Sequence, residues 1–348
     1  MARSRCLVVE FDSERGMLVE NYLTGKTTEL HPALLAPLNS LADAVSWSDA
    51  QARFGGDEGA REILAALLSQ DVLLDADGDP AALERRILTE WPWGRDSLLF
   101  HLSTRRTRFA YDLDTERQQL VALARESPPP PPYKDYGRDD IPLPASDLPD
   151  VSLADVLARR RTGRAFSGDP VTMRDLATIL RTCWGVSSIH NDPGVGPVVL
   201  KTSPSGGARH PVEVYCIAQN VDGLEAGTYH FSAGRNALAR LSAAAPSSDR
   251  VLEALTGQPW VADAAAVFLM TAVTKRSAWK YRQSHAYRVI LLDAGHLGQT
   301  FHLVCTALGL APWTSAAIDE AIAEELLGLD DPSEIVLYAA ACGRPREP

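Results

Sequence analysis

Hydrophobic and polar residues alternate at the start of the chain, in the stretch CLVVEFDSERGMLVENY (residues 6–22). An alternation with a period of two predicts two strands, and the polar DSERG between them predicts a hairpin turn. Apolar residues at helical spacing follow in PALLAPLNSLADA (32–44) and EGAREILAALLSQDVLL (58–74). Two strands followed by helices predict a small winged-helix-like module over residues 1–80.

A run of five prolines, Pro128–Pro132, interrupts this pattern. Consecutive prolines favour an extended polyproline II conformation without internal hydrogen bonds. We therefore expect residues 127–150 to form a linker, or a strap along a surface, that marks the main domain boundary. Residues 81–126 are expected to form a connecting helical segment before it.

Residues 151–348 mix helical and strand patterns. Ser152 and Thr172 are each followed three residues later by Asp, a capping spacing that predicts the start of a helix. A further long helix is expected over about 285–308. Strands are predicted at 211–220, 227–231, 264–273 and 333–343. Four strands with long helices predict an α+β sandwich.

The charge balance is acidic, with 34 Lys and Arg against 45 Asp and Glu and a formal net charge of −11. Because nucleic-acid phosphates require a basic surface, this excludes nucleic acid as a general partner. The most apolar long stretch, residues 289–311, contains Asp293, His296, Gln299 and His302 and is too polar to span a membrane. We expect a cytoplasmic protein, because the N-terminus lacks the apolar core of a signal peptide.

The sequence indicates no metal site and no disulfide framework. The five cysteines include no CxxC pair. His296 and His302 are six residues apart on the expected long helix and do not share a face, so we interpret them as core or interface histidines. Cys305 and Cys342 are interpreted as small core hydrophobes.

Two motifs suit a ligand that carries a phosphate and a flat ring. RRTGRAF (160–166) offers arginines for a phosphate, with a solvated arginine run at a helix end as the alternative. SPSGGARHP (203–211) contains Gly206 and Gly207, which let backbone come close to a flat ligand. The sequence has none of the glycine fingerprints of dinucleotide-binding, P-loop or hydrolase proteins.

Two further stretches carry candidate chemistry. The chain closes on CGRPREP, where Arg344 either joins a phosphate site or is part of a charged tail. AWKYRQ (278–283) sets Lys280 beside Tyr281. This pair is either a proton-transfer device or a surface lysine and a packed tyrosine before a helix.

Taken in order, RRTGRAF, PSGGARHP, KYRQSHAYRVILLDAGHLGQ, LGLAPWTSAAIDE and the terminal GRP resemble the nitroreductase superfamily. More narrowly they resemble its SagB-type branch, which includes azoline dehydrogenases of ribosomal-peptide biosynthesis. The resemblance covers about residues 150–348. It implies a nitroreductase-like α+β fold, with an antiparallel-rich sheet between helices, and an intertwined homodimer that binds FMN at its interface. Ala208 stands where ordinary nitroreductases carry Asn, which suits the SagB-type branch, and Thr162 takes a usual Ser position.

The resemblance assigns two sets of residues to the flavin. The set for the phosphate and the pyrimidine edge comprises Arg160, Thr162, Arg164 and Arg344. The set near the ring comprises Pro204, Ser205 and Gly207 from the partner subunit, and the backbone of Ala316 and Ala317 facing flavin N5.

The resemblance also assigns catalysis to Lys280 and Tyr281. Oxidation of an azoline to an azole removes one proton from carbon and one hydride, so a base is needed beside the flavin. Unperturbed pKa values of both side chains lie near ~10, so we expect the site to lower at least one. The spacing leaves open which residue is the base. Adjacent side chains of an extended segment point to opposite faces, so both reach one substrate only where the chain is irregular.

Residues 1–80 resemble the PqqD-like elements that hold leader peptides, in length, element order and the closing LLSQDVLL. A structural or dimerising module is the alternative. The whole chain is thus interpreted as a homodimeric FMN-dependent oxidase that converts azolines of a ribosomal peptide to azoles, with a cyclodehydratase as a partner. Two alternatives stay open: a flavin oxidoreductase for a small-molecule or amino-acid-derived intermediate, and a non-catalytic scaffold subunit.

Overall fold

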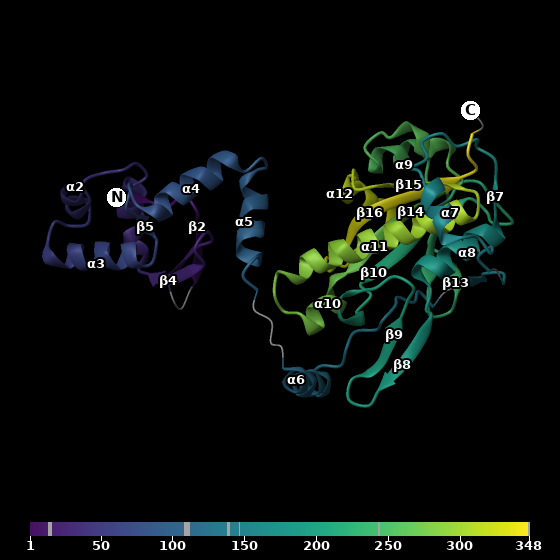
Figure 1. Cartoon of the computed structure of the whole chain (residues 1–348), viewed down its shortest axis with the longest axis horizontal. Coiled ribbons are helices and arrows are strands. Elements are labelled where there is room, and N and C mark those ends of the chain that lie inside the picture. Colours follow the sequence, from purple (N-terminus) through teal and green to yellow (C-terminus); the bar gives the residue numbers. More distant parts are fainter. Residues whose placement is uncertain (13–15, 108–111, 138–139, 146, 243, 347–348) are drawn as a thin grey trace. The chain divides into compact units, whose positions relative to one another are not determined.

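The structure is a computed structural model that describes residues 1–12, 16–107, 112–137, 140–145, 147–242 and 244–346. The chain forms two compact units, Met1–Arg108 and Phe109–Pro348 (Figure 1). The division falls inside the predicted connecting segment, residues 81–126, and precedes the proline-rich stretch. Residues 13–15 of the predicted hairpin turn lie outside the described residues.

The first unit contains an antiparallel sheet, β2 (Leu7–Asp12), β3 (Gly16–Asn21) and β4 (Lys26–Leu30). The two predicted strands correspond to β2 and β3, whereas β4, KTTEL, is too polar to show an apolar alternation. A short ladder pairs β1 (Ala2–Arg3) with β5 (Leu73–Leu74). The helices are η1 (Pro32–Leu34), α1 (Leu35–Ser40), α2 (Trp47–Arg53), α3 (Glu58–Ser69), α4 (Asp79–Glu90) and α5 (Arg95–Thr104). Met17 and Val19 of β3 pack with Leu64 of α3 in its core.

The second unit is built on one seven-stranded antiparallel sheet. Its strand order is β15-β16-β14-β10-β12-β13-β6. The central strands are those predicted: β10 (Val212–Ala218), β12 (Gly227–Ser232), β14 (Ala266–Val273) and β16 (Glu334–Gly343). The outer strands β6 (Asp140–Pro142), β13 (Ala237–Arg240) and β15 (Ala311–Ser315) were not predicted. The fold is therefore α+β with an antiparallel sheet, as the resemblance implies.

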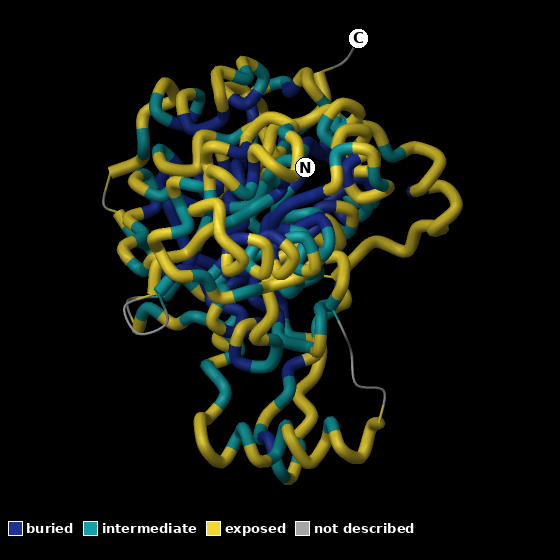
Figure 2. The backbone as a smooth tube through the Cα atoms, turned by 90° about the vertical axis from the view of Figure 1, so that its left-hand side faces the viewer, coloured by how far each residue is buried: buried dark blue, intermediate teal, exposed yellow. Residues whose placement is uncertain are grey.

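Helices cover both faces of this sheet. Along β14, Phe268 and Met270 enter the core shared with α8 (Met173–Trp184) and α11 (Ala286–Ala307). The intervening Val267 and Leu269 enter the core shared with α9 (Ser248–Ala254) and α12 (Glu320–Leu327). This alternation of one strand between two cores explains why β14 is apolar at every position except Thr271. Figure 2 shows the buried segments gathered inside, with exposed loops around them.

The remaining elements lie around this sandwich. They are α6 (Leu113–Glu126), α7 (Leu153–Arg159), β7 (Val171–Thr172), the hairpin β8 (Ser188–Asp192) and β9 (Gly196–Leu200), η2 (Gly206–Ala208), β11 (Val221–Asp222), η3 (Pro259–Asp263) and α10 (Thr274–Lys280). The predicted caps are observed: Ser152 Oγ accepts from Ala154 N, and Thr172 Oγ1 accepts from Asp175 N. Helix α11 matches the predicted long helix.

The proline-rich stretch is tied into the second unit, which is why the units divide before it. Ser127 O accepts a hydrogen bond from Trp279 Nε1 at 2.7 Å, and Pro131 O accepts one from Arg276 Nε at 2.8 Å. Further along, Lys134 Nζ lies 2.5 Å from Glu334 Oε2. We call residues 127–136 the proline strap. It holds α10, which carries Trp279 and Arg276.

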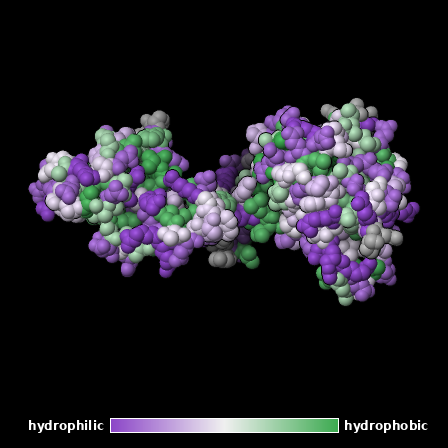
Figure 3. All heavy atoms as spheres, turned by 90° about the horizontal axis from the view of Figure 1, so that it is seen from above, coloured by the Kyte–Doolittle hydropathy of each residue, from purple (hydrophilic) through white to green (hydrophobic). Residues whose placement is uncertain are grey.

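The exposed surface is mainly hydrophilic in the view of Figure 3, with separate hydrophobic patches on both units. Among the described residues, no helix has the length and apolar character needed to cross a bilayer. Large exposed apolar side chains of the second unit include Leu153 and Leu157 of α7 and Leu291 and Leu292 of α11.

Candidate active site

The segment after α7 runs beside the end of the chain. Gly163 N donates to Pro312 O at 2.7 Å, and Ser167 N donates to Arg344 O at 2.9 Å. A Cβ atom at Gly163 would lie 2.7 Å from Cβ of Ala311, so this close approach requires glycine. The structure thus brings the RRTGRAF motif, the start of β15 and Arg344 together.

The arginines of this region have different surroundings. Arg344 forms an ion pair of 3.0 Å with Asp175 of α8. Exposed Arg164 lies over the ring of Trp260, with its Cζ 5.5 Å from the ring centroid, and has no ion pair with any described carboxylate. Thr162, two residues before Arg164, is half-buried. Of these two guanidinium groups, only that of Arg344 is neutralised.

Arg160 is half-buried at the end of α7 and forms no ion pair within the described ranges. His302 of α11 is 5% exposed, and its Nε2 lies 3.1 Å from Thr314 Oγ1. Burial, and then the charge of Arg160, lower the pKa of His302 to about 4. His302 is therefore neutral at neutral pH, and Arg160 keeps an uncompensated positive charge.

Ala316 and Ala317 follow β15 and are exposed. Ala317 N donates to Ser315 Oγ at 3.0 Å, and Ala317 O accepts from Gln258 Nε2 at 3.1 Å. The backbone of Ala317 is therefore held by its own chain.

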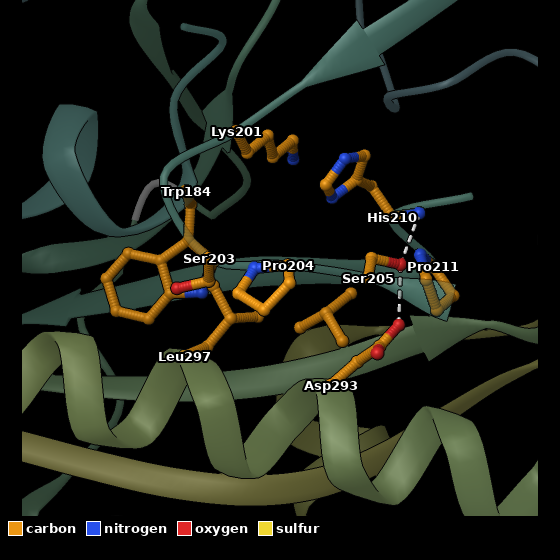
Figure 4. A pocket seen from close by; sticks show the side chains of 10 residues that line it. Trp184, Lys201, Ser203, Pro204, Ser205, His210, Pro211, Asp293 and Leu297 are labelled. Atoms are coloured by element: carbon orange, nitrogen blue, oxygen red, sulfur yellow. Dashed lines mark hydrogen bonds between the residues drawn. The ribbon is translucent and has the colours of Figure 1, made fainter. Parts of the chain in front are cut away.

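The glycine turn is fixed by a buried carboxylate (Figure 4). Asp293 of α11 is 4% exposed and accepts from Ser205 Oγ at 2.6 Å and from Gly206 N at 3.2 Å. Ser205 Oγ in turn accepts from His210 N at 2.9 Å. Burial raises the pKa of Asp293, while these hydrogen bonds oppose the shift. Ser205 therefore orders the turn, and His296 Nδ1 lies 3.3 Å from the neighbouring Pro204 O.

Gly207 brings the turn against Tyr281. It has a left-handed φ of 59°, and a Cβ atom there would lie 2.3 Å from Tyr281 Oη. A Cβ atom at Gly206 would lie 2.3 Å from Val289 Cγ1 of α11. Both glycines are therefore required by close packing.

Lys280 and Tyr281 lie where α10 ends. Lys280 is the last helical residue, and Tyr281 is extended, with φ −117° and ψ 94°. The Lys280 Nζ lies 5.2 Å from the centroid of the Tyr281 ring and 3.2 Å from Glu116 Oε1 of α6. The chain is irregular at this helix end, so the two side chains contact each other rather than pointing to opposite faces.

Comparison with known proteins identifies this domain. Residues 157–344, more than half of the chain, match the model of the nitroreductase family. The chain belongs to the nitroreductase family. Members of this family are oxidoreductases that typically bind flavin.

Two relatives in sequence and one solved structure give the range of similarity. The chain is 28% identical over 193 residues to MJ1384 of Methanocaldococcus jannaschii, named as a nitroreductase, covering 56% of this chain and 92% of that protein. It is 33% identical over 138 residues to the trifolitoxin-processing protein TfxB of Rhizobium leguminosarum bv. trifolii, covering 39% of this chain and 37% of TfxB. The crystal structure of a protein from Anabaena variabilis, described as a nitroreductase, superposes with a TM-score of 0.54 at 24% identity, covering 74% of this chain and 49% of that one.

Sequence reasoning missed several polar residues of this nitroreductase domain. Lys201 and His210 line a cavity of about 10 Å³, the space that one water needs. Burial lowers the pKa of Lys201 to about 8 and that of His210 to about 4. The only sequence feature that could have indicated Lys201 is its position, two residues before the glycine turn.

The two histidines of α11 have different surroundings. No group of three potential ligands among the described residues could hold a metal ion. His302 is buried, as predicted, whereas His296 is exposed on α11 and contacts the glycine turn rather than the core. Cys305 and Cys342 are both fully buried in the core, as predicted.

Proposed function

We propose that this nitroreductase-family protein is a SagB-type, FMN-dependent oxidase that converts azolines in a ribosomal peptide to azoles. The observation that carries the proposal is the contact of Tyr281 with Gly207, with Lys280 alongside. It joins a proton-transfer pair to the glycine turn that the resemblance assigns to the flavin ring. The name of TfxB, a trifolitoxin-processing protein, supports a peptide as the substrate.

The residues present fit FMN. Arg160 and Arg164 lack carboxylate partners among the described residues, so their charges are available to a phosphate. Gly207 is exposed and Gly206 is half-buried, so the turn offers backbone that a flat ring could approach. FMN, when bound, would accept the hydride, with oxygen as the final electron acceptor.

The chain itself would position the azoline and remove its proton. Tyr281 is fixed by Gly207 on one side and by the Lys280 ammonium above its ring. Glu116 balances part of the Lys280 charge and holds that ammonium in place. Proton transfer by a positioned side chain typically contributes ~10²–10⁴-fold to the rate.

We further propose that the protein acts as a homodimer. Helices α7 and α11 contact each other, and their exposed leucines would form an apolar surface that a second copy covers. This arrangement would bring Pro204, Ser205 and Gly207 to the flavin of the partner subunit.

The first unit is proposed to hold the leader peptide. Among the described residues, strand β2 pairs only with β3, so a strand from a bound peptide could add to its outer edge. Phe11 of β2 is 67% exposed. A tethered leader would raise the local concentration of the azoline, and a cyclodehydratase would supply that azoline.

A second function is favoured by one observation. The similarity to MJ1384 spans 92% of that protein but only 56% of this chain. The nitroreductase domain therefore has a counterpart of nearly its own size, which would suit a small-molecule substrate. Turnover of a leaderless small azoline by residues 109–348 as well as by the full chain would favour this alternative.

The first test is the absorption spectrum of the purified full chain, with mass identification of the released cofactor. We expect bound FMN that bleaches with reductant and recovers in air. An azoline peptide should then lose two hydrogens in wild type but not in Lys280→Ala or Tyr281→Phe. Lys275→Ala is the matched control, because Lys275 lies on the same helix and pairs with Asp331 at 2.7 Å. A colourless protein that cannot be loaded with FMN would leave only the scaffold interpretation.

A further inference from the structure

A second cavity, of about 230 Å³, lies between the proline strap and β9. Its lining combines apolar surface with two guanidinium groups, contributed by Pro129–Pro132, Pro197, Val199, Ala208, Arg209 and Arg276. Pockets for drug-sized ligands typically hold ~300–1,000 Å³, so this cavity suits a smaller group. None of the residues assigned to the flavin lines it.

One of the two cations is fully neutralised. Arg276 is 4% exposed, and its Nη2 lies 2.6 Å from Glu213 Oε1. Its Nη1 donates to His210 O at 3.1 Å and its Nε donates to Pro131 O at 2.8 Å. Every nitrogen of Arg276 thus has a partner, and this residue holds the wall of the cavity.

The other cation, Arg209, has no carboxylate partner among the described residues. Its Cζ lies 5.2 Å from the centroid of the Trp279 ring, and its Nε donates to Gly207 O at 3.2 Å. Burial lowers the pKa of Arg209, which indicates that water compensates its charge only in part. The cavity therefore contains one uncompensated positive charge next to apolar proline walls.

The backbone around Arg209 is strained. Gly207, Ala208 and His210 have left-handed φ values of 59°, 53° and 43°. Only Gly207 adopts this region without a steric penalty, and strained non-glycine residues cluster at functional sites. This conformation holds Arg209 at the cavity while the preceding Gly207 touches Tyr281.

We propose that this cavity binds a carboxylate of the substrate through Arg209, with the attached apolar group against the proline strap. The site would orient the azoline toward Tyr281, so its role in substrate selection rests on the proposed function. The binding of a carboxylate in this cavity does not depend on the proposed function. The carboxylate comes either from the C-terminus of the peptide or from an acidic side chain near the heterocycle.

Binding is tested with benzoate and its neutral isostere benzamide on the purified full chain, by titration calorimetry. We expect benzoate to bind, benzamide to bind at least about tenfold more weakly, and Arg209→Gln to weaken benzoate by about 10–100-fold. Arg209→Lys should retain part of the affinity, and the exposed Arg86→Gln should retain all of it. Equal binding of both probes, no benzoate binding, or equal affinity in Arg209→Gln would overturn the proposal.

The source of the carboxylate is tested with azoline peptides that carry a free C-terminus, a C-terminal amide, or a Glu-to-Gln change beside the ring. The peptide that lacks the recognised carboxylate should have a KM about tenfold higher with kcat unchanged, and Arg209→Gln should abolish the difference. Equal KM values for all three peptides would exclude this role in substrate selection. Benzoate binding without azoline turnover would instead keep the carboxylate site and remove the proposed reaction.

Discussion

Two groups of charged side chains in the second unit differ in how their charges are balanced. Under the proline strap, Glu213 is 3% exposed and lies 2.6 Å from Arg276 and 2.9 Å from His230. Around the RRTGRAF motif, Arg160 and Arg164 have no carboxylate partner among the described residues. Buried charges persist only when paired, so the first group is complete and serves structure. The imbalance of charge, rather than its amount, distinguishes the region that can receive an anion.

The group under the proline strap includes a second buried carboxylate, Glu334. Glu334 is 4% exposed and accepts from Tyr215 Oη at 2.7 Å and from Thr271 Oγ1 at 2.8 Å. Lys134 of the proline strap balances the charge of Glu334, with its Nζ 2.5 Å from Glu334 Oε2. The strap is thus held by ion pairs to the sheet as well as by hydrogen bonds to α10.

Removing one charge from the complete group should have the largest effect. Glu213→Gln leaves Arg276 buried without its counter-charge and alters the hydrogen bond to His230, so the free energy of unfolding should fall by about 3–5 kcal/mol. Urea unfolding measures this. Glu225→Gln is the control, since its side chain is 77% exposed and its pair with Arg240 should contribute about 1 kcal/mol or less. Equal losses in the two variants would contradict the comparison.

Acid should act through histidines that lie beside cations. Burial lowers the pKa of His210 and of His302 from 6.5 to about 4, with Lys201 and Arg160 as the next causes. Between these pH values the unfolded chain binds protons that the folded chain does not. The free energy of unfolding should therefore fall as pH decreases from 6.5 to about 4, by up to about 1.4 kcal/mol per pH unit for each histidine.

Unfolding of His302→Asn as a function of pH checks this expectation. In His302→Asn the free energy of unfolding should depend less steeply on pH than in the wild type. In His190→Asn, on the exposed β8–β9 hairpin, this pH dependence should match that of the wild type. An unchanged slope in His302→Asn would show that Arg160 and burial do not act on this histidine.

Removing a charge from the incomplete group should affect ligand binding and little else. Arg160→Gln should weaken FMN by about 10–100-fold, because a charge-assisted hydrogen bond to the phosphate contributes about 1.5–3 kcal/mol. Its free energy of unfolding should change by only about 0.5 kcal/mol. Flavin fluorescence titration and urea unfolding measure the two quantities. Arg250→Gln, from a surface ion pair with Glu253, should bind FMN as the wild type does; a large loss of stability in Arg160→Gln would place Arg160 in the structural group.

A change in the glycine turn should affect turnover more than stability. Gly207→Ala and Gly223→Ala both introduce a Cβ at positive φ, 59° and 82°, at a cost of about 1 kcal/mol each. Only at Gly207 would the Cβ meet Tyr281, at 2.3 Å, while Gly223 has nothing within 4 Å. We expect azoline turnover to fall at least about tenfold in Gly207→Ala alone. Matching turnover in the two variants would separate Tyr281 from the reaction.

The sequence predicted the elements whose signals are local. Thr172 caps α8, and the mainly apolar runs of β14 and β16 are strands, because capping spacing and apolar runs are properties of a few adjacent positions. Strand β15 was missed because Pro312 interrupts its pattern, and proline is tolerated there since β15 is an edge strand. The short β6 ends in proline at the opposite edge.

The candidate site could likewise be predicted only where its signals are local. Its motifs are contiguous in sequence and were recognised, but their partners are distant. Helix α10 was not predicted, because it depends on bonds from Trp279 and Arg276 to proline-strap residues about 150 positions away. The Glu116 partner of Lys280 and the Asp293 anchor of Ser205 likewise depend on long-range packing. No local pattern contains that information.

The proposed use of oxygen as the final electron acceptor bears on the five buried cysteines. Two-electron reduction of oxygen yields hydrogen peroxide, which attacks thiolates rather than thiols. Burial raises the pKa of the Cys6, Cys183, Cys216 and Cys305 thiols, and all five cysteines are sealed from solvent. Burial therefore keeps these thiols away from the peroxide that the proposed turnover would generate, and we expect activity to persist over many cycles without added reductant.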